Sequence, residues 1–147
     1  MSRLLIAAAL LAAAAVVAEV LRRRKPEPPT QAPWSVPAQL DRSDFDAPGT
    51  PWLVVVFSST SCVACQGAVA KAAVLASREV AVQEVSYQAR KDLHDRYAIE
   101  AAPTIVVADH DGVVRASFVS TPTATDLWAA VAEAREPGST PRCEMEG

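Results

Sequence analysis

The sequence predicts an α/β fold in which helices flank a central mixed β-sheet, preceded by one N-terminal transmembrane helix. Three observations support this prediction. A long apolar segment lies near the N-terminus, and strand and helix patterns alternate later in the chain. Between them, the continuous apolar run at 52–57 (WLVVVF), with three β-branched valines, is typical of a strand buried on both faces. A chain of 147 residues, 50% of them hydrophobic, suffices for one core and accessory segments.

The apolar segment, residues 4–21, predicts a membrane anchor that contacts lipid. About 18 residues at 1.5 Å each span roughly 27 Å, the low end for crossing a bilayer. A cleaved signal peptide is the alternative. The four cations at 22–25 favour the anchor, because cations there resist translocation. The positive-inside rule then predicts a single-pass membrane protein with a cytoplasmic domain, and export is the alternative.

Composition changes divide the rest of the chain. Residues 26–37 hold five prolines in twelve positions, which favours an extended, semi-stiff linker. The predicted parts are an anchor with its basic flank at 1–25, this linker at 26–37, a folded domain at 38–136 and a flexible polar tail at 137–147.

Within the folded domain, each element follows from a local pattern. A leading strand and helix are suggested at 36–40 and 43–45, and His110-Asp111-Gly112 signals the turn of a hairpin. Helix-forming composition, charge and helical spacing predict the helices, and β-branched runs predict the strands. We expect helices at 65–78, 90–97 and 123–135, and strands at 52–57, 80–85, 104–108 and 113–119.

The main chemical signal is the pair Cys62 and Cys65, placed where the buried strand ends and a helix begins. The free N–H groups and dipole of a helix N-terminus stabilise an anion, so a cysteine there is favoured as the reactive thiolate. A cysteine three residues later lies one turn away. Cys62 should therefore attack a substrate disulfide from the exposed edge, and the more buried Cys65 should resolve the mixed disulfide.

A structural zinc site is the main alternative for a C-x-x-C pair. Zinc needs two further ligands, and the candidates His94, His110 and Cys143 are scattered rather than paired. We expect His94 and His110 to be surface residues and Trp52 and Trp128 to pack. Cys143 would be a spectator thiol, exchange disulfides with the pair, or bond to a partner. The formal charge of −3 and a pI near 5.4 speak against a nucleic-acid partner.

Several segments resemble the thioredoxin family. LVVVFSSTSCVACQ resembles its active-site strand, loop and helix, and YAIEAAPTIVV (97–107) resembles its Y-x-V-x-x-x-P-T motif. DHDGVV matches the turn between its last two strands, and VPAQLDRSDFDAP resembles its opening strand and helix. The similarity spans roughly residues 36–135 and implies a thioredoxin fold.

The resemblance also implies site residues. Pro103 would be the family's cis-proline facing the cysteines, and the backbone of Ala102 would pair with an extended substrate. With Thr104, these residues are the expected substrate-binding positions.

The chain departs from the family beside the cysteines. Ser61 replaces the usual Trp, and Val63-Ala64 replaces Gly-Pro. Val56 stands where thioredoxins bury an Asp that accepts the proton of the second cysteine. Glu84 is a distant substitute that the sequence does not favour. These changes suggest a specialised partner.

The sequence thus predicts a protein dithiol–disulfide oxidoreductase with roles in electron transport and cell redox homeostasis. It would need no metal or organic cofactor, because the redox group is the Cys62–Cys65 disulfide. Its partners would be protein thiols or disulfides and an unidentified reductase or membrane redox partner. The alternatives are a non-catalytic binding module of the same fold at the membrane, and a dedicated reductase for cytochrome or metal-centre assembly.

Overall fold

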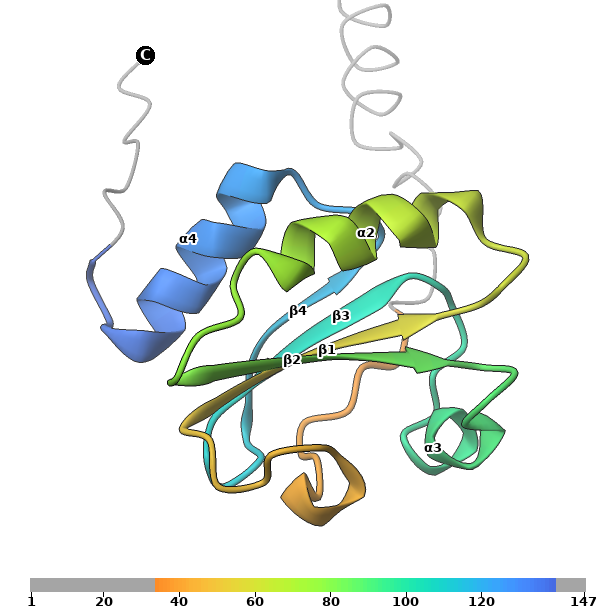
Figure 1. Ribbon diagram of the computed structural model, residues 1–147, viewed down its shortest axis with the longest axis horizontal. Helices are drawn as coiled ribbons and strands as arrows, with labels where there is room; N and C mark the ends of the chain where they lie inside the picture. The colour runs from red at the N-terminus through yellow and green to blue at the C-terminus, as the bar shows by residue number, and fades with distance from the viewer. Residues whose placement is uncertain (1–33, 140–147) are drawn as a thin grey trace, which may run out of the picture. The chain divides into compact units, whose positions relative to one another are not determined.

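The computed structural model describes residues 34–139, and these contain one four-stranded sheet. Its strands are β1 (Trp52–Ser58), β2 (Val80–Ser86), β3 (Thr104–Ala108) and β4 (Val114–Val119). Their order across the sheet is β2-β1-β3-β4 (Figure 1). β2 runs parallel to β1, whereas β3 is antiparallel to both β1 and β4. The predicted mixed sheet is confirmed.

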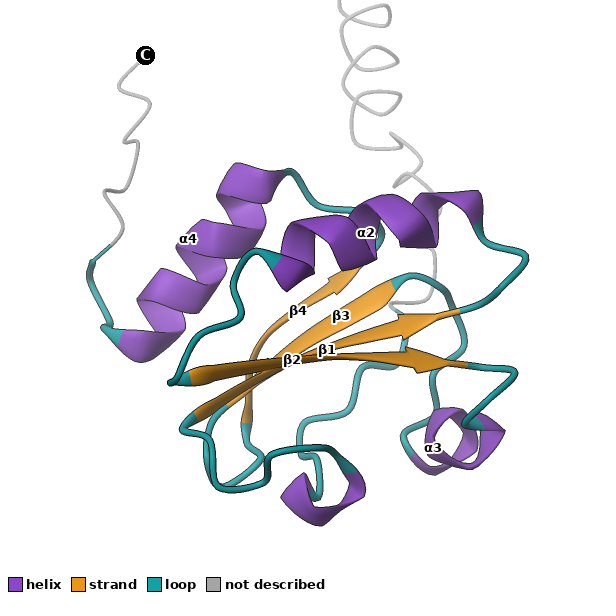
Figure 2. Cartoon of the chain, in the orientation of Figure 1, coloured by secondary structure: helices purple, strands orange, loops and turns teal. Residues whose placement is uncertain are grey.

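Helices cover both faces of this sheet (Figure 2). Helices α2 (Val63–Ala73) and α4 (Ala124–Arg135) lie over one face. The short helix α3 (Lys91–Arg96) and the 3-10 turn η1 (Arg42–Asp44) lie on the other. The predicted flanking arrangement is therefore also confirmed.

Strand β1 contributes side chains to the hydrophobic cores on both faces of the sheet, because successive side chains of a strand point to opposite faces. Val54 and Val56 join the cluster under α2 and α4, together with Ala68 and Leu127. On the other face, Leu53, Val55 and Phe57 pack with Leu40 and Leu93. Burial on both faces explains why this segment is continuously apolar.

Helix α2 begins earlier and ends earlier than predicted. Its last turn tightens, since the N–H groups of Leu75 and Ala76 each donate to a carbonyl three residues back. The Ser77 hydroxyl then accepts from the N–H groups of Glu79 and Val80, which turns the chain into β2. The prediction of helix to residue 78 was wrong because this serine-based turn competes with the helix.

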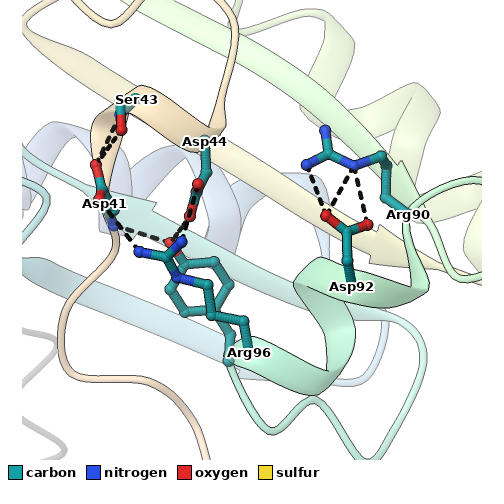
Figure 3. Close-up of polar contacts among 7 residues, drawn as sticks. Asp41, Ser43, Asp44, Arg90, Asp92 and Arg96 are labelled. Atoms are coloured by element: carbon teal, nitrogen blue, oxygen red, sulfur yellow. Dashed lines mark hydrogen bonds and ion pairs between the residues drawn. The ribbon is translucent and has the colours of Figure 1, made fainter.

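The predicted leading strand is reduced to one bridge between Gln39 and Val113, and the following helix to η1. Polar contacts fix this segment against α3 (Figure 3). Arg96 donates to both Asp41 and Asp44 at 3.2 Å. Tyr97 donates to Asp44, and burial together with this hydrogen bond raises the pKa of Tyr97 to about 12.

The turn between β3 and β4 closes the end of the sheet that lies opposite Pro103. Asp109 accepts hydrogen bonds from the N–H groups of Asp111 and Val113 and from the Arg115 guanidinium. Burial raises the pKa of Asp109, but these donors outweigh it and hold the pKa below its usual value. Gly112 has a φ of +80°, and its carbonyl accepts a hydrogen bond from the Leu40 N–H at 2.8 Å.

The predicted anchor and most of the linker lie outside the described residues, as does Cys143 of the predicted tail. Within residues 34–139, no helix has the length and hydropathy that a membrane crossing needs.

Candidate active site

The two cysteines lie at the start of α2, just after the loop of residues 59–61 that follows β1, which we call the active-site loop. Cys62 is the N-cap residue, and the Cys65 backbone N–H donates to the Cys62 Sγ at 3.2 Å. The two sulfurs form a disulfide, with the Cα atoms 5.4 Å apart. In the reduced protein, the same N–H and the helix dipole would stabilise a thiolate on Cys62.

The two sulfur-bearing residues differ in exposure. Cys65 is 2% exposed and packs on the sheet side of α2, whereas Cys62 is half-buried. An incoming disulfide can therefore reach Cys62 before it reaches Cys65. The predicted roles, with Cys62 as the nucleophile and Cys65 as the resolving cysteine, require this difference in burial.

The loop before β3 brings Pro103 to the cysteines. Because β3 is antiparallel to β1, its first residue, Thr104, pairs with Phe57 near the end of β1. The Cys62 Sγ lies 3.6 Å from the Ala102 carbonyl oxygen, and the Ala102–Pro103 peptide bond is cis. The cis-proline expected from the resemblance is present.

The three predicted substrate-binding residues are not equally accessible. Ala102 is exposed, while Pro103 and Thr104 are buried. The Thr104 hydroxyl donates to the Ala101 carbonyl at 2.9 Å, which braces the loop. Ala102 can therefore contact a partner directly, whereas Pro103 and Thr104 lie beneath the surface.

Gln88 holds the active-site loop in place, a role that the sequence analysis missed. Its side-chain oxygen accepts from the Thr60 N–H and the Ser86 hydroxyl, and its amide donates to the Ser59 hydroxyl. The loop is thereby tied to the turn after β2. Spacing gave no signal for this contact, because it joins segments 28 residues apart.

Apolar surface adjoins the reactive cysteine. Val63 follows Cys62 directly and is 88% exposed, and Ala64 and Ala102 are exposed as well. This combination offers a protein partner a small apolar contact area beside the sulfur.

Comparison with known structures identifies the architecture. Thioredoxin from Fasciola hepatica is 24% identical over 57% of this chain and 81% of its own, with a TM-score of 0.51. The germline-specific thioredoxin Deadhead of Drosophila melanogaster is 22% identical over 62% of this chain and 88% of its own, with a TM-score of 0.54. The chain has the thioredoxin fold. A mutant thioredoxin from Halobacterium salinarum is 18% identical over 69% of this chain and 90% of its own, with a TM-score of 0.55.

No protein-family model matches the sequence, and no curated protein matches it. The similarity to thioredoxins therefore rests on the fold and on the motifs around the cysteines and Pro103.

Within this thioredoxin fold, Val56 is fully buried among apolar side chains, so β1 carries no acid beneath the cysteines. A cavity of about 260 Å³ beside the disulfide is instead lined by Glu84, together with Ser58, Cys62 and Cys65. Glu84, which the sequence analysis did not favour, therefore adjoins the site.

The structure places one of the two histidines differently from the sequence prediction. The prediction of a surface His94 was wrong: it is 4% exposed, its Nε2 lies 2.9 Å from the Val85 carbonyl oxygen, and its ring packs edge-on against Phe57. Its burial was hidden by the charged residues around it in α3.

Trp52 packs against the core under α4, but Trp128 is 46% exposed and is not a core residue. His110 is exposed, as expected.

One group within residues 34–139 has the donor types of a metal site, namely Asp109, His110 and Asp111. It lies in the turn opposite the cysteines, and Asp109 is already engaged by Arg115. It therefore adds no ligand to the cysteine pair.

Proposed function

We propose that this protein is a thiol–disulfide oxidoreductase that exchanges disulfides with protein substrates through Cys62 and Cys65. The observation that carries the proposal is the disulfide at the N-terminus of α2, in which the Cys65 residue is buried and the half-buried Cys62 has its sulfur 3.6 Å from the Ala102 carbonyl oxygen, next to the cis Pro103.

The reaction follows from this geometry. The Cys62 thiolate attacks one sulfur of a substrate disulfide, and the other substrate sulfur leaves as a thiolate. Cys65 then loses its proton and attacks the Cys62 Sγ. The Cys62–substrate bond breaks, the second substrate thiol is released, and the protein retains the Cys62–Cys65 disulfide. Two electrons pass from the protein to the substrate, and the reverse sequence oxidises a substrate dithiol.

The substrate segment would lie beside Ala102. The exposed Ala102 can pair with an extended peptide through its backbone, and the exposed Val63, which follows Cys62 in the chain, can supply apolar contact. The small Ala102 side chain leaves room for a bulky substrate residue. Regeneration of the dithiol falls to an unidentified reductase or membrane redox partner, and the reaction needs no organic cofactor or metal.

A redox titration tests this function. Full-length protein carrying Cys143→Ser is equilibrated with glutathione buffers, and the Cys62–Cys65 state is measured by thiol alkylation. A two-electron midpoint near or below about −250 mV is expected for a reductase, and one above about −180 mV for an oxidant or isomerase. A pair that stays reduced across the accessible range would rule out the proposal.

We also propose that residues 4–21 anchor the protein in a membrane, with the domain on the cytoplasmic face. The apolar length and the cations at 22–25 support this proposal. The full chain is expected to remain with membranes after alkaline carbonate washing, whereas a chain lacking residues 1–25 is expected to be released. Release of the full chain would contradict the anchor, and protection of the domain from protease added to spheroplasts would support the cytoplasmic face.

A further inference from the structure

We propose that Glu84 accepts the proton of Cys65 through water during the resolving step, with Ser58 positioning its carboxylate. This inference rests on the proposed function and assigns a residue to its second step. Cys65 must lose a proton before its sulfur can attack, and a buried thiol resists ionisation.

The strand register places Glu84 on the correct face of the sheet. Val56 and Glu84 are direct neighbours in the parallel pairing of β1 with β2. Val56 belongs to the core under α2, and Val82 and Val80, two and four residues before Glu84, pack on that same face. Since strand side chains alternate, Glu84 projects toward the side of the sheet where α2 carries Cys65.

Ser58 fixes the carboxylate. Its hydroxyl is buried and donates to the Glu84 Oε1 at 2.6 Å. A hydrogen bond to one carboxylate oxygen orients the group and leaves the other oxygen able to accept a proton. Ser58 is the last residue of β1, so it ties Glu84 to the strand that leads into the active-site loop.

A shared cavity completes the connection. Cys65, Ser58 and Glu84 all line the 260 Å³ cavity, which is large enough for several water molecules. The thiol proton can thus pass through water to Glu84, and the exposed carboxylate can return it to solvent. Among the described residues, Glu84 is the one charged side chain that lines this cavity.

Other ionisable groups nearby are less well placed. His94 and Tyr87 contact each other, and His94 reaches the Val85 carbonyl from the α3 face of the sheet. Lys71 of α2 donates to the Pro122 carbonyl at 2.8 Å. Glu100 lies exposed in the loop before Ala102 and does not line the cavity.

The Cys65 S–H bond breaks, and its proton passes through water to the Glu84 carboxylate. The Cys65 thiolate attacks the Cys62 Sγ of the mixed disulfide, the Sγ–Sγ bond forms, and the bond from Cys62 to the substrate sulfur breaks. The substrate sulfur leaves as a thiolate and takes up a proton from solvent.

The test separates the two thiol steps with dithiobis-nitrobenzoate, an aromatic disulfide whose thiolate product is coloured. Full-length Cys143→Ser protein is reduced, freed of reductant and mixed with substoichiometric reagent. Attack by Cys62 releases the first coloured thiolate. Resolution by Cys65 releases the second, at a rate independent of reagent concentration.

In the parent protein, the second phase is expected to change little between about pH 6 and pH 8, because Glu84 takes up the Cys65 proton and removal of that proton does not depend on hydroxide from the solvent. In Glu84→Gln, resolution must wait for ionisation to solvent, so its rate should rise about tenfold per pH unit and fall at least about tenfold below the parent near pH 6. The first phase should stay unchanged. Ser58→Ala should give an intermediate second phase.

Glu79→Gln is the matched control, because it removes the same charge just before the opposite end of β2, where Glu79 pairs with Arg135. It should behave as the parent. Equal second-phase rates and pH profiles in Glu84→Gln and the parent would overturn the inference, as would a slowing by one constant factor at every pH. Release of only one coloured thiolate per reagent molecule by the parent would instead contradict the proposed function itself.

Discussion

Replacing Cys62 with serine is expected to abolish disulfide exchange, with a loss on the order of 10³-fold or more. The serine hydroxyl is not ionised at neutral pH and cannot form the mixed disulfide. Because Cys62 is half-buried at the helix N-cap, a serine fits there without a cavity and retains a capping oxygen for the Cys65 N–H. The measurement is the rate of insulin disulfide reduction with dithiothreitol as electron donor, in the full-length chain.

Cys65→Ser should behave differently from Cys62→Ser. It keeps the nucleophile but lacks the resolving thiol, so it should accumulate a mixed disulfide with the substrate that is visible on a non-reducing gel. Cys143→Ser serves as the matched control, because it removes the one cysteine of the chain that is not part of the C-x-x-C pair. It should keep activity and trap nothing.

The outcome of these variants separates the proposed function from its main rival. If Cys62→Ser retained the biological activity of the full chain, the fold would serve as a binding module rather than as an oxidoreductase. Trapping by Cys62→Ser rather than Cys65→Ser would mean that the two roles are reversed.

The central strands could be predicted from sequence because burial on both faces leaves a direct compositional trace. β1 is apolar at residues 52–57 and β3 at residues 105–108, and every residue of β3 is buried. The cysteine pair was equally predictable, since its position between a buried strand and a helix is a local property. The position of the Pro103 loop beside Cys62 was predicted only from the resemblance, because this approach depends on strand pairing between segments 40 residues apart.

Other features depended on partners that a local pattern cannot show. Glu84 follows Cys65 by 19 residues, and only the parallel register places it beside Val56. His94 lies in a charged six-residue helix, too short for its buried side to appear as a periodic pattern. Helix α2 ended early because Ser77 offers its own hydrogen bonds, a competition that composition alone does not resolve.

Gly112→Ala is expected to lower the free energy of unfolding by about 2–4 kcal/mol. Two effects add. The φ of +80° is unfavourable for any residue with a Cβ, and a Cβ at this position would lie 1.9 Å from the Leu40 carbonyl oxygen. Backbone cannot yield as a flexible side chain does, so the hydrogen bond from the Leu40 N–H to the Gly112 carbonyl would be strained or lost. Urea denaturation followed by circular dichroism measures the change.

Two other glycines separate these effects. Gly138 also has a positive φ, of +88°, but a Cβ there would meet no atom within 4 Å, so Gly138→Ala should cost about 1 kcal/mol or less. Gly67 lies within α2 with open space around it, so Gly67→Ala should stabilise the protein by about 0.5–1 kcal/mol. A Gly112→Ala cost no larger than that of Gly138→Ala would mean that residues 38–40 move away without loss. The N-terminal bridge would then add little to the stability of the sheet. Because Gly112 lies at the opposite end of β3 from Pro103, the folded fraction of Gly112→Ala should still exchange disulfides at the parent rate.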